Sequence, residues 1–239
     1  MALHRLGSVT IGVPNVAETA AYYEDFGLTP LGQDRFATTD GGEQLRVVHA
    51  PRRQVVEITI GAEDQDDIDR IARQIDRLDL AASVTEGRVE ALEPIAGFKA
   101  VVQVMPHLAQ EPIPATPYNG PGRIDRGTGR APGILRDERV RPHKLGHVVI
   151  GSTDQAATQK FFTDGIGLKV SDVIPSLAAF MRCSTDHHNV LVQQAPVNFL
   201  HHTSWQVAHS LFNWGPPPPP SFVLPEDLAA HMTGSHHAG

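Results

Sequence analysis

The stretch LGSVTIGVPNVAETAAYYEDFGLTPLG, residues 6–32, returns as LGHVVIGSTDQAATQKFFTDGIGLKVSD, residues 145–172, with one inserted residue. Each copy opens with apolar residues at strand spacing, continues with a polar and alanine-rich segment of helix length, and closes with a Gly-Leu pair. A strand, a short amphipathic helix and a glycine stop together predict a β-α unit. The chain is therefore built on an internal repeat.

The repeat unit extends beyond this strand and helix. Short β-rich segments follow each copy, within residues 43–61 and 176–194. The first half then supplies a second unit, which begins with a strand at residues 54–61 and a helix at Asp66–Leu80 whose isoleucines recur at helical spacing beneath a charged face. These patterns predict an α+β fold of paired βαβββ modules that form two open-barrel domains.

The domain boundaries follow from the repeat and from composition. Residues 1–108 are predicted to form an N-terminal domain, residues 109–142 a linker rich in Pro, Gly and Arg, and residues 143–239 a C-terminal domain. The repeat pattern stops after Val207, and the five prolines at 216–220 fit neither a helix nor a central strand. The last module is therefore predicted to be truncated or altered after residue 207.

The bulk composition narrows the class of protein. A chain of 239 residues is long enough for two domains of about 100–120 residues, each with its own core. The net charge of −7, with acidic and basic residues interspersed, argues against nucleic acid or a membrane surface as a partner. The single cysteine, Cys183, fits a reducing compartment, and no apolar run approaches the ~18 residues of a membrane span. We expect a cytoplasmic protein that binds a small ligand.

Histidines occupy corresponding places in the C-terminal repeat. His147 lies near the start of one predicted strand, His202 lies in a His-His pair near the symmetric start, and His188 lies on the strand between them. One such histidine alone is more often a core or surface residue, but their joint occurrence favours a metal site. Ser8 takes the place of His147 in the first copy, so the N-terminal domain is predicted to be non-catalytic. His201 is expected beside the site rather than on the metal.

Three segments, LGHVVIGSTDQAATQKFFTDGIGLKV, TDHHNVLV and LHHTSWQV, resemble in order and spacing the type I extradiol ring-cleavage dioxygenases of the vicinal oxygen chelate superfamily. The resemblance covers both halves of the chain and fails from Ala208 onward. It implies a silent N-terminal barrel, a metal-bearing C-terminal barrel and assembly into a homo-oligomer. It also implies Fe(II), or alternatively Mn(II), as the cofactor and a catecholic compound and O2 as the substrates.

The resemblance assigns roles residue by residue. His147 and His202 match the two histidine ligands of the metal, and His188 matches the histidine that handles protons during ring cleavage. His236 matches a histidine that contacts a substrate hydroxyl, although the surrounding GSHHAG is equally typical of an expression-vector remnant. The family's third ligand, a glutamate, is not found in the chain, and Glu226 is a weak substitute because it lies where an acidic residue favours a helix start.

The residue types fit this chemistry. Two neutral imidazoles and one carboxylate suit Fe(II) and leave positions open for a chelating substrate and for O2. A histidine with a pKa near neutrality suits the proton transfers. The sequence therefore predicts an extradiol dioxygenase whose activity is impaired if the glutamate is missing. Two alternatives stay open, a glyoxalase-like isomerase or lyase and a metal-free protein that binds a small aromatic compound on the same fold.

Overall fold

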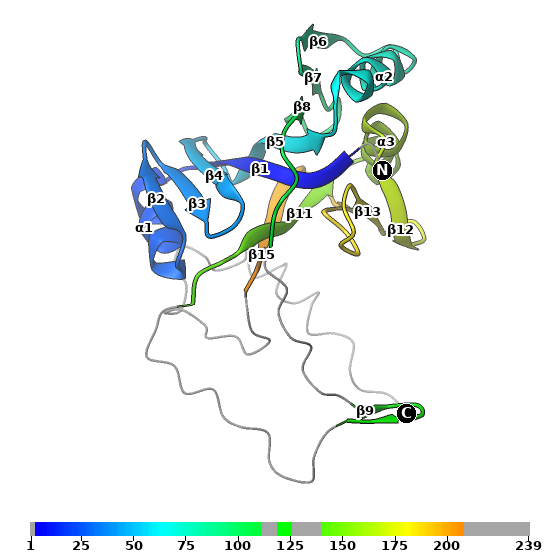
Figure 1. Cartoon of the computed structure of the whole chain (residues 1–239). Helices are drawn as coiled ribbons and strands as arrows, with labels where there is room; N and C mark the ends of the chain where they lie inside the picture. The colour runs from blue at the N-terminus through cyan, green and yellow to red at the C-terminus, as the bar shows by residue number, and fades with distance from the viewer. Residues whose placement is uncertain (1–2, 111–118, 126–139, 208–239) are drawn as a thin grey trace.

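The backbone forms two mixed β-sheets, as described by a computed structural model for residues 3–110, 119–125 and 140–207. The first sheet has eight strands in the order β2-β3-β4-β1-β5-β8-β7-β6, and the second has five in the order β12-β13-β14-β11-β15. Figure 1 shows both sheets with their helices at the sides. The predicted α+β class of paired βαβββ modules is confirmed. The three-part division at residues 108 and 142 stays a prediction.

The first sheet is built from two complete βαβββ units. The first unit contains β1 (Leu3–Val13), α1 (Val16–Phe26), β2 (Thr29–Gly32), β3 (Arg35–Thr38) and β4 (Gly42–His49). The second unit contains β5 (Gln54–Ala62), α2 (Gln65–Asp76), β6 (Ala82–Thr85), β7 (Arg88–Leu92) and β8 (Lys99–Val104). In each unit the first strand pairs in parallel with the last, and the two first strands, β1 and β5, join the units in antiparallel.

Within the described residues, the second sheet repeats this pattern with one complete unit and the first strand of another. Its elements are β11 (Lys144–Ser152), α3 (Gln155–Lys160), the π-helix η1 (Phe161–Ile166), β12 (Lys169–Ile174), β13 (Ala178–Arg182), β14 (Val190–Gln194) and β15 (Phe199–Gln206). Strand β11 pairs in parallel with β14 and in antiparallel with β15. A two-stranded hairpin, β9 (Asn119–Gly120) and β10 (Arg123–Ile124), lies within the predicted linker.

Each of the three α-helices, α1, α2 and α3, starts after a residue whose carboxylate or amide oxygen caps it. Asn15, Asp64 and Asp154 accept hydrogen bonds from backbone N–H groups three residues ahead, in α1, α2 and α3 respectively. Helix α2 ends at Asp76, four residues before the predicted end. The chain turns there because Asp79 has a left-handed φ of 57° and the Leu80 N–H donates to a carbonyl inside the helix.

The inserted residue of the second repeat lies in η1. The Tyr22-Tyr23 and Phe161-Phe162 pairs stand at the same distance from the start of each copy, but the C-terminal copy needs one more residue to reach its Gly-Leu exit. The helix absorbs that residue by widening from α to π at Phe161–Ile166, and both copies then end on a glycine with positive φ. The sequence alignment predicted one inserted residue, but neither its place in the helix nor its π-helical form was predicted.

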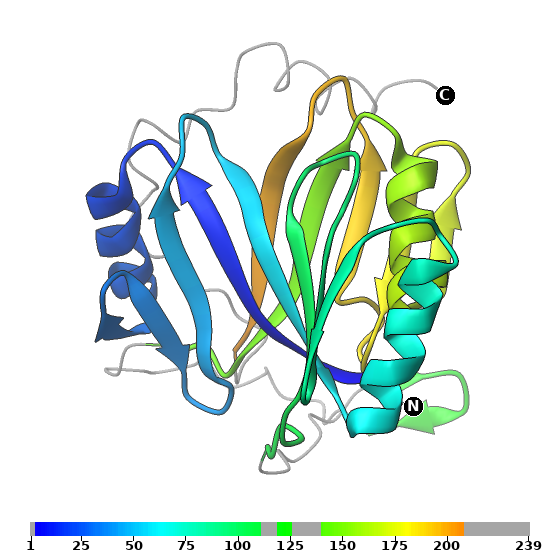
Figure 2. The same ribbon diagram turned by 90° about the horizontal axis from the view of Figure 1, so that it is seen from above.

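The two sheets pack against each other along β1 with β11 and β5 with β15, and their buried side chains form one core. In Figures 1 and 2, α1 lies at one side of the sheets, and α2 lies beside the α3–η1 helix at the opposite side. A Cβ placed on Gly165 of η1 would come within 3.1 Å of Leu78, so glycine permits this close approach. Buried hydrogen bonds also cross the interface, from Thr158 to the Glu93 carboxylate and from the Leu145 N–H to Gln44.

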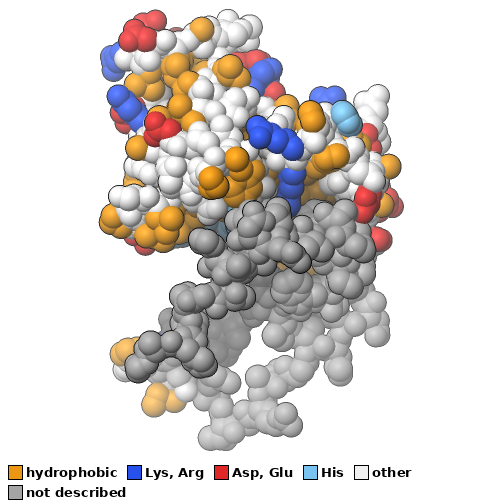
Figure 3. Space-filling view, turned by 180° about the vertical axis from the view of Figure 1, so that it is seen from behind, with side chains coloured by type: hydrophobic (Ala, Val, Ile, Leu, Met, Phe, Trp, Pro, Cys, Tyr) orange, Lys and Arg blue, Asp and Glu red, His pale blue; other side chains and the backbone are white. Residues whose placement is uncertain are grey.

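The surface shows no single-sign charged face in the view of Figure 3, where acidic and basic side chains are scattered among apolar ones. None of the helices in the described part of the chain is long and apolar enough to cross a membrane.

Replacement of Ile75 tests whether the α2–η1 contact stabilises the fold. Ile75 is fully buried on α2 and faces Gly165 of η1. Ile75→Ala should lower the free energy of unfolding by about 2–5 kcal/mol, because it removes buried methyl groups and leaves a cavity. Arg73→Ala, at an exposed position of the same helix, should change it by less than about 0.5 kcal/mol. Urea denaturation measures both, and equal effects would contradict the described packing.

Candidate metal centre

The two predicted histidine ligands meet on one face of the second sheet. His147 lies on β11 and His202 on β15, and the antiparallel register sets His202 opposite Val149, two residues from His147. Residues two apart on a strand point to the same face, so the two imidazoles become diagonal neighbours. Their Nε2 atoms lie 3.2 Å apart. The structure therefore brings together residues that are 55 positions apart in the sequence.

This separation fits two ligands of one metal ion. With metal–nitrogen distances of about 2.0–2.1 Å, two nitrogens on one ion lie about 2.9–3.4 Å apart for bond angles between square and tetrahedral. In the metal-free chain the same contact is a hydrogen bond, in which one Nε2 carries a proton and the other accepts it. For both Nε2 atoms to bind one divalent ion, that proton must move to Nδ1 of the same ring, so both imidazoles stay neutral.

His188 lies against the first of these ligands. Its ring stacks on the His147 ring with centroids 4.2 Å apart, and Phe180 on β13 meets it edge-on at 5.2 Å. The Nδ1 atom of His188 lies 3.1 Å from Nδ1 of the exposed His187. The side chain is half-buried, so it can exchange protons with solvent while it stays beside the pair of ligands.

His201 contacts the ring nitrogen of His202 that does not face His147. Its Nδ1 atom lies 2.7 Å from Nδ1 of His202. When Nε2 of His202 binds a metal, Nδ1 must carry the ring proton, and the unprotonated Nδ1 of His201 can accept it. Such a hydrogen bond fixes the tautomer and ring orientation of a ligating histidine. The expectation that His201 lies beside the site is consistent with this contact.

The histidine cluster favours neutral imidazoles. Burial, together with the neighbouring His188 and His202, lowers the pKa of His147 from 6.5 to about 4. Burial is also the main reason why the pKa values of His188, His201 and His202 are lowered. A metal ligand must present an unprotonated nitrogen, so the cluster is suited to bind a cation at neutral pH without first losing protons.

A cavity of about 280 Å³ borders the cluster. Its lining includes His147, His188, Ser204, Trp205 and Lys144. Trp205 also packs against the core and donates its indole N–H to Thr203, so it forms a fixed wall. A second cavity, of about 320 Å³, lies nearer to the start of β1 and contains neither predicted ligand. The cavity of about 280 Å³ is therefore the one beside His147 and His188.

The described residues do not supply the third ligand. Asp186 lines the same cavity, but its carboxylate accepts hydrogen bonds from Lys144 at 2.8 and 3.0 Å and from Ser184 and Asn189. Among the described residues, no group of three potential ligands includes His147 or His202. The predicted catalytic His236 and the alternative ligand Glu226 lie outside the described residues. The described residues therefore supply two of the three expected donors, His147 and His202.

The first sheet shows what occupies the equivalent positions without histidines. Its β1–β5 ladder repeats the register and the bulges of β11–β15, which places Ser8 at the position of His147 and Glu57 at that of His202. Lys99 on β8 lies 3.7 Å from the Glu57 carboxylate and 3.2 Å from that of Glu90. The first sheet therefore has ion pairs between Lys99 and the carboxylates of Glu57 and Glu90 near the position at which the second sheet has the His147–His202 pair.

The structure also contains a histidine cluster that the sequence interpretation missed. His4, Glu63 and His107 lie together at one edge of the first sheet. His107 had no partner that could be identified from the sequence. The available signal was positional, because the three residues lie at ends of three adjacent strands.

The chain is similar in sequence to a known protein over part of its length. No protein-family model matches it. Metapyrocatechase 2 from Cupriavidus necator is 29% identical over 93 residues, which are 37% of this chain and 29% of that protein. The matched region therefore spans less than a third of this relative's length.

Solved structures share the fold over most of the chain. BphC, a halotolerant catechol dioxygenase, superposes with a TM-score of 0.63 at 19% identity, over 86% of this chain and 70% of that one. The Mn(II)-bound glyoxalase from Novosphingobium aromaticivorans gives a TM-score of 0.61 at 23% identity, over 85% and 65% respectively. The chain thus has the vicinal oxygen chelate fold, and extradiol catechol dioxygenases are among its neighbours in sequence and structure.

Removal of the His201 imidazole tests its contact with His202. His201→Ala should weaken Fe(II) binding by about 10–100-fold, because His202 loses the acceptor that holds its Nδ1 proton. His201→Gln should restore part of the affinity through its amide oxygen. Anaerobic titration with Fe(II) measures both variants. Equal affinities in the wild type and in His201→Ala would contradict the supporting role.

The lowered pKa of His147 predicts how stability depends on pH. The unfolded chain binds a proton at His147 near pH 6.5, whereas the folded, metal-free chain does so only near pH 4. The unfolded state therefore holds more protons between these values, and the free energy of unfolding should fall as the pH falls from 6.5 to 4. His147→Gln should reduce this loss, while His49→Gln, at an exposed position, should leave it unchanged. Denaturant titrations with chelator at several pH values measure the slopes, and equal slopes in His147→Gln and wild type would refute the assignment.

Proposed function

We propose that the chain is an extradiol dioxygenase that opens the ring of a catecholic compound with O2 at a non-haem Fe(II) centre. The observation that carries the proposal is the 3.2 Å approach of the His147 and His202 Nε2 atoms with His188 stacked against them. The vicinal oxygen chelate fold and the dioxygenases among the neighbours support the same reaction class. Mn(II) is the alternative ion.

In this proposal His147 and His202 hold the metal, and His201 holds His202 in the ligating tautomer. Fe(II), when bound, supplies a site at which a catechol can chelate and electrons can pass from the ring to O2. The third ligand would have to come from outside the described residues. The catalytic role of His236 stays a prediction for the same reason.

His188 is the proposed acid and base. It lies beside His147 and lines the cavity, so a substrate hydroxyl bound there comes within reach of its ring. Burial lowers its pKa, which leaves the imidazole unprotonated near neutral pH and able to accept a proton from that hydroxyl. Trp205 forms an aromatic wall of the cavity, and Phe180 packs edge-on against the His188 ring, so both reduce the access of water to that imidazole.

A metal-free protein that binds a small aromatic compound is the second candidate. One observation favours it, since the described residues supply only two of the three ligands expected at the His147–His202 centre. The cavity beside the histidines would then hold the compound without cleaving it. The glyoxalase-like alternative gains support from the Mn(II)-bound glyoxalase among the structural neighbours. Homo-oligomer formation stays a prediction of the resemblance, and a cytoplasmic location stays a prediction of the composition.

Turnover of catechol distinguishes these candidates. The full chain, loaded with Fe(II) without oxygen and then mixed with catechol and air, should give a yellow ring-fission product. His147→Ala and His202→Ala should lose iron and product together. His188→Gln should retain iron and lower kcat by about 10²–10⁴-fold, because it removes the proton acceptor.

His49→Ala, which changes an exposed histidine on β4, is the matched control and should behave as the wild type. Calorimetry with catechol separates the remaining cases. Catechol that binds to an iron-free chain and is recovered intact would favour the binding protein. Conversion of a hemithioacetal without any oxygen uptake would favour the glyoxalase-like enzyme.

A further inference from the structure

Three potential metal ligands meet at one edge of the first sheet. His4 lies near the start of β1, Glu63 directly follows β5, and His107 follows β8. Strands β1 and β5 are antiparallel and β5 and β8 are parallel, so the start of β1 and the ends of β5 and β8 fall side by side. The pairing of Ala62 with both Leu3 and Val104 fixes this arrangement. The cluster is therefore set by the sheet and not by a loop alone.

The side chains are already close to one another. One ligand atom from each of the three residues lies within 4.8 Å of the other two. The His107 Nε2 atom lies 2.6 Å from the Glu63 carboxylate, and the His107 ring stacks on His4 with centroids 4.1 Å apart. The hydrogen bond from His107 lowers the pKa of Glu63, so this carboxylate is ionised at neutral pH. Two imidazoles and one anion thus occupy the same small volume.

His4 is held in the tautomer that a metal requires. Its Nε2 lies 3.1 Å from the Ala62 carbonyl oxygen, which can only accept, so Nε2 carries the proton. The other nitrogen, Nδ1, is buried and has no hydrogen-bond partner in the part of the chain that the structure describes. Burial also lowers the pKa of His4, which keeps the ring neutral. A ligating histidine commonly donates its second ring N–H to a backbone carbonyl in this way.

We infer that His4, Glu63 and His107 form a divalent metal site, separate from the His147–His202 pair, whose donor set fits Zn²⁺. Zinc takes imidazole nitrogens and carboxylate oxygens at about 2.0–2.2 Å, often three protein ligands with a water as the fourth. The ligand atoms must therefore draw together by an ångström or two. Glu63 and His107 can do so because their side chains are 53% and 63% exposed, while the sheet holds His4 in place.

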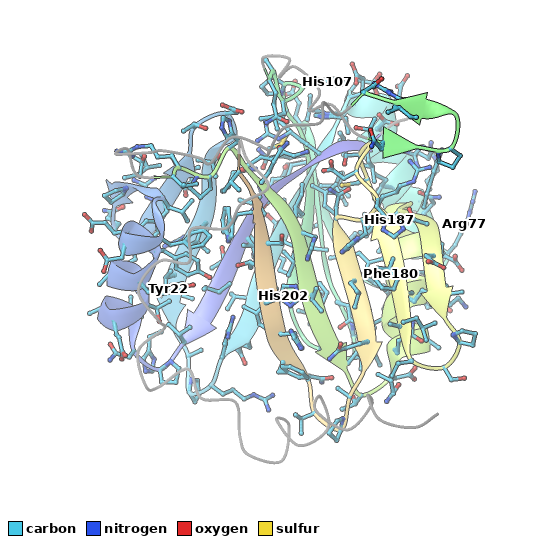
Figure 4. The ribbon with its side chains drawn as sticks, turned by 90° about the horizontal axis from the view of Figure 1, so that it is seen from below. Tyr22, Arg77, His107, Phe180, His187 and His202 are labelled. Carbon is cyan, nitrogen blue, oxygen red and sulfur yellow. The ribbon has the colours of Figure 1, made fainter. Side chains whose placement is uncertain are left out.

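The surroundings suit an added cation. The cavity of about 320 Å³ borders both His4 and His107 and offers room for a water ligand. The guanidinium of the neighbouring Arg5 donates to the carbonyl oxygens of Gly41 and Pro106, and these hydrogen bonds hold it. In Figure 4, His107 lies at the edge of the sheet while His202 lies partway along its strand. The two clusters share no residue, so a metal ion can bind to His4, Glu63 and His107 whether or not one is bound to His147 and His202.

Calorimetric titration with Zn²⁺ tests the inference in a full-length background that lacks the other candidate ligands. This background carries His147→Ala and His202→Ala, with His236 and His237 also replaced by Ala, and is dialysed against chelator. It should still bind one Zn²⁺ per chain. Adding His107→Ala or Glu63→Gln should weaken that binding by about tenfold or more, because each change removes a direct ligand from an exposed position that does not support the fold.

His49→Ala in the same background is the matched control and should leave the Zn²⁺ affinity unchanged. Circular dichroism checks that every variant keeps the fold. Unchanged affinity in both His107→Ala and Glu63→Gln would overturn the site, and so would a background that binds no Zn²⁺. Neither result bears on ring cleavage, which depends on residues that the background already lacks.

Discussion

The antiparallel pairing of β11 with β15 is the constraint on which the candidate centre depends. It carries His147 and His202 onto one face and sets their Nε2 atoms 3.2 Å apart. The ladder has two register shifts, between Leu145 and His147 and between Val149 and Ile150. The β1–β5 ladder has shifts at both equivalent places. A bulge that recurs in both copies re-aims the side chains beside it, so the geometry of the site belongs to the repeat itself.

Much of this fold could be predicted because strand and helix periodicity are local properties. The repeated Leu-Gly and Gly-Leu pairs marked the start and the end of each β-α unit. The matching of strands between units predicted that His147 and His202 would lie close together. The internal alignment also favoured His202 over His201, and the contact of His201 with the back of the His202 ring is consistent with that interpretation. Symmetry between copies thus gave three-dimensional information that a single motif does not contain.

Other features could not be predicted because they depend on packing between distant segments. The widening of the second repeat's helix to a π-helix is a response of the backbone to one extra residue against α2. The end of α2 at Asp76 depends on a left-handed residue, Asp79, that no residue-type preference required. The partners of His107, His4 and Glu63, lie more than 40 residues away in the sequence, and nothing in its own neighbourhood pointed to them.

The two copies use equivalent positions for different purposes. Glu57, the counterpart of His202, forms an ion pair with Lys99, so the first sheet balances charge where the second gathers neutral imidazoles. His4 and His143 are likewise counterparts, yet His143 contacts the Asp40 carboxylate at 2.8 Å, while Nδ1 of His4 is buried and has no hydrogen-bond partner among the described residues. A buried acceptor costs free energy when it stays unpaired. The sheet holds His4 in that state because the Ala62 carbonyl fixes its proton on the opposite nitrogen, and a cation is the partner that would relieve the cost.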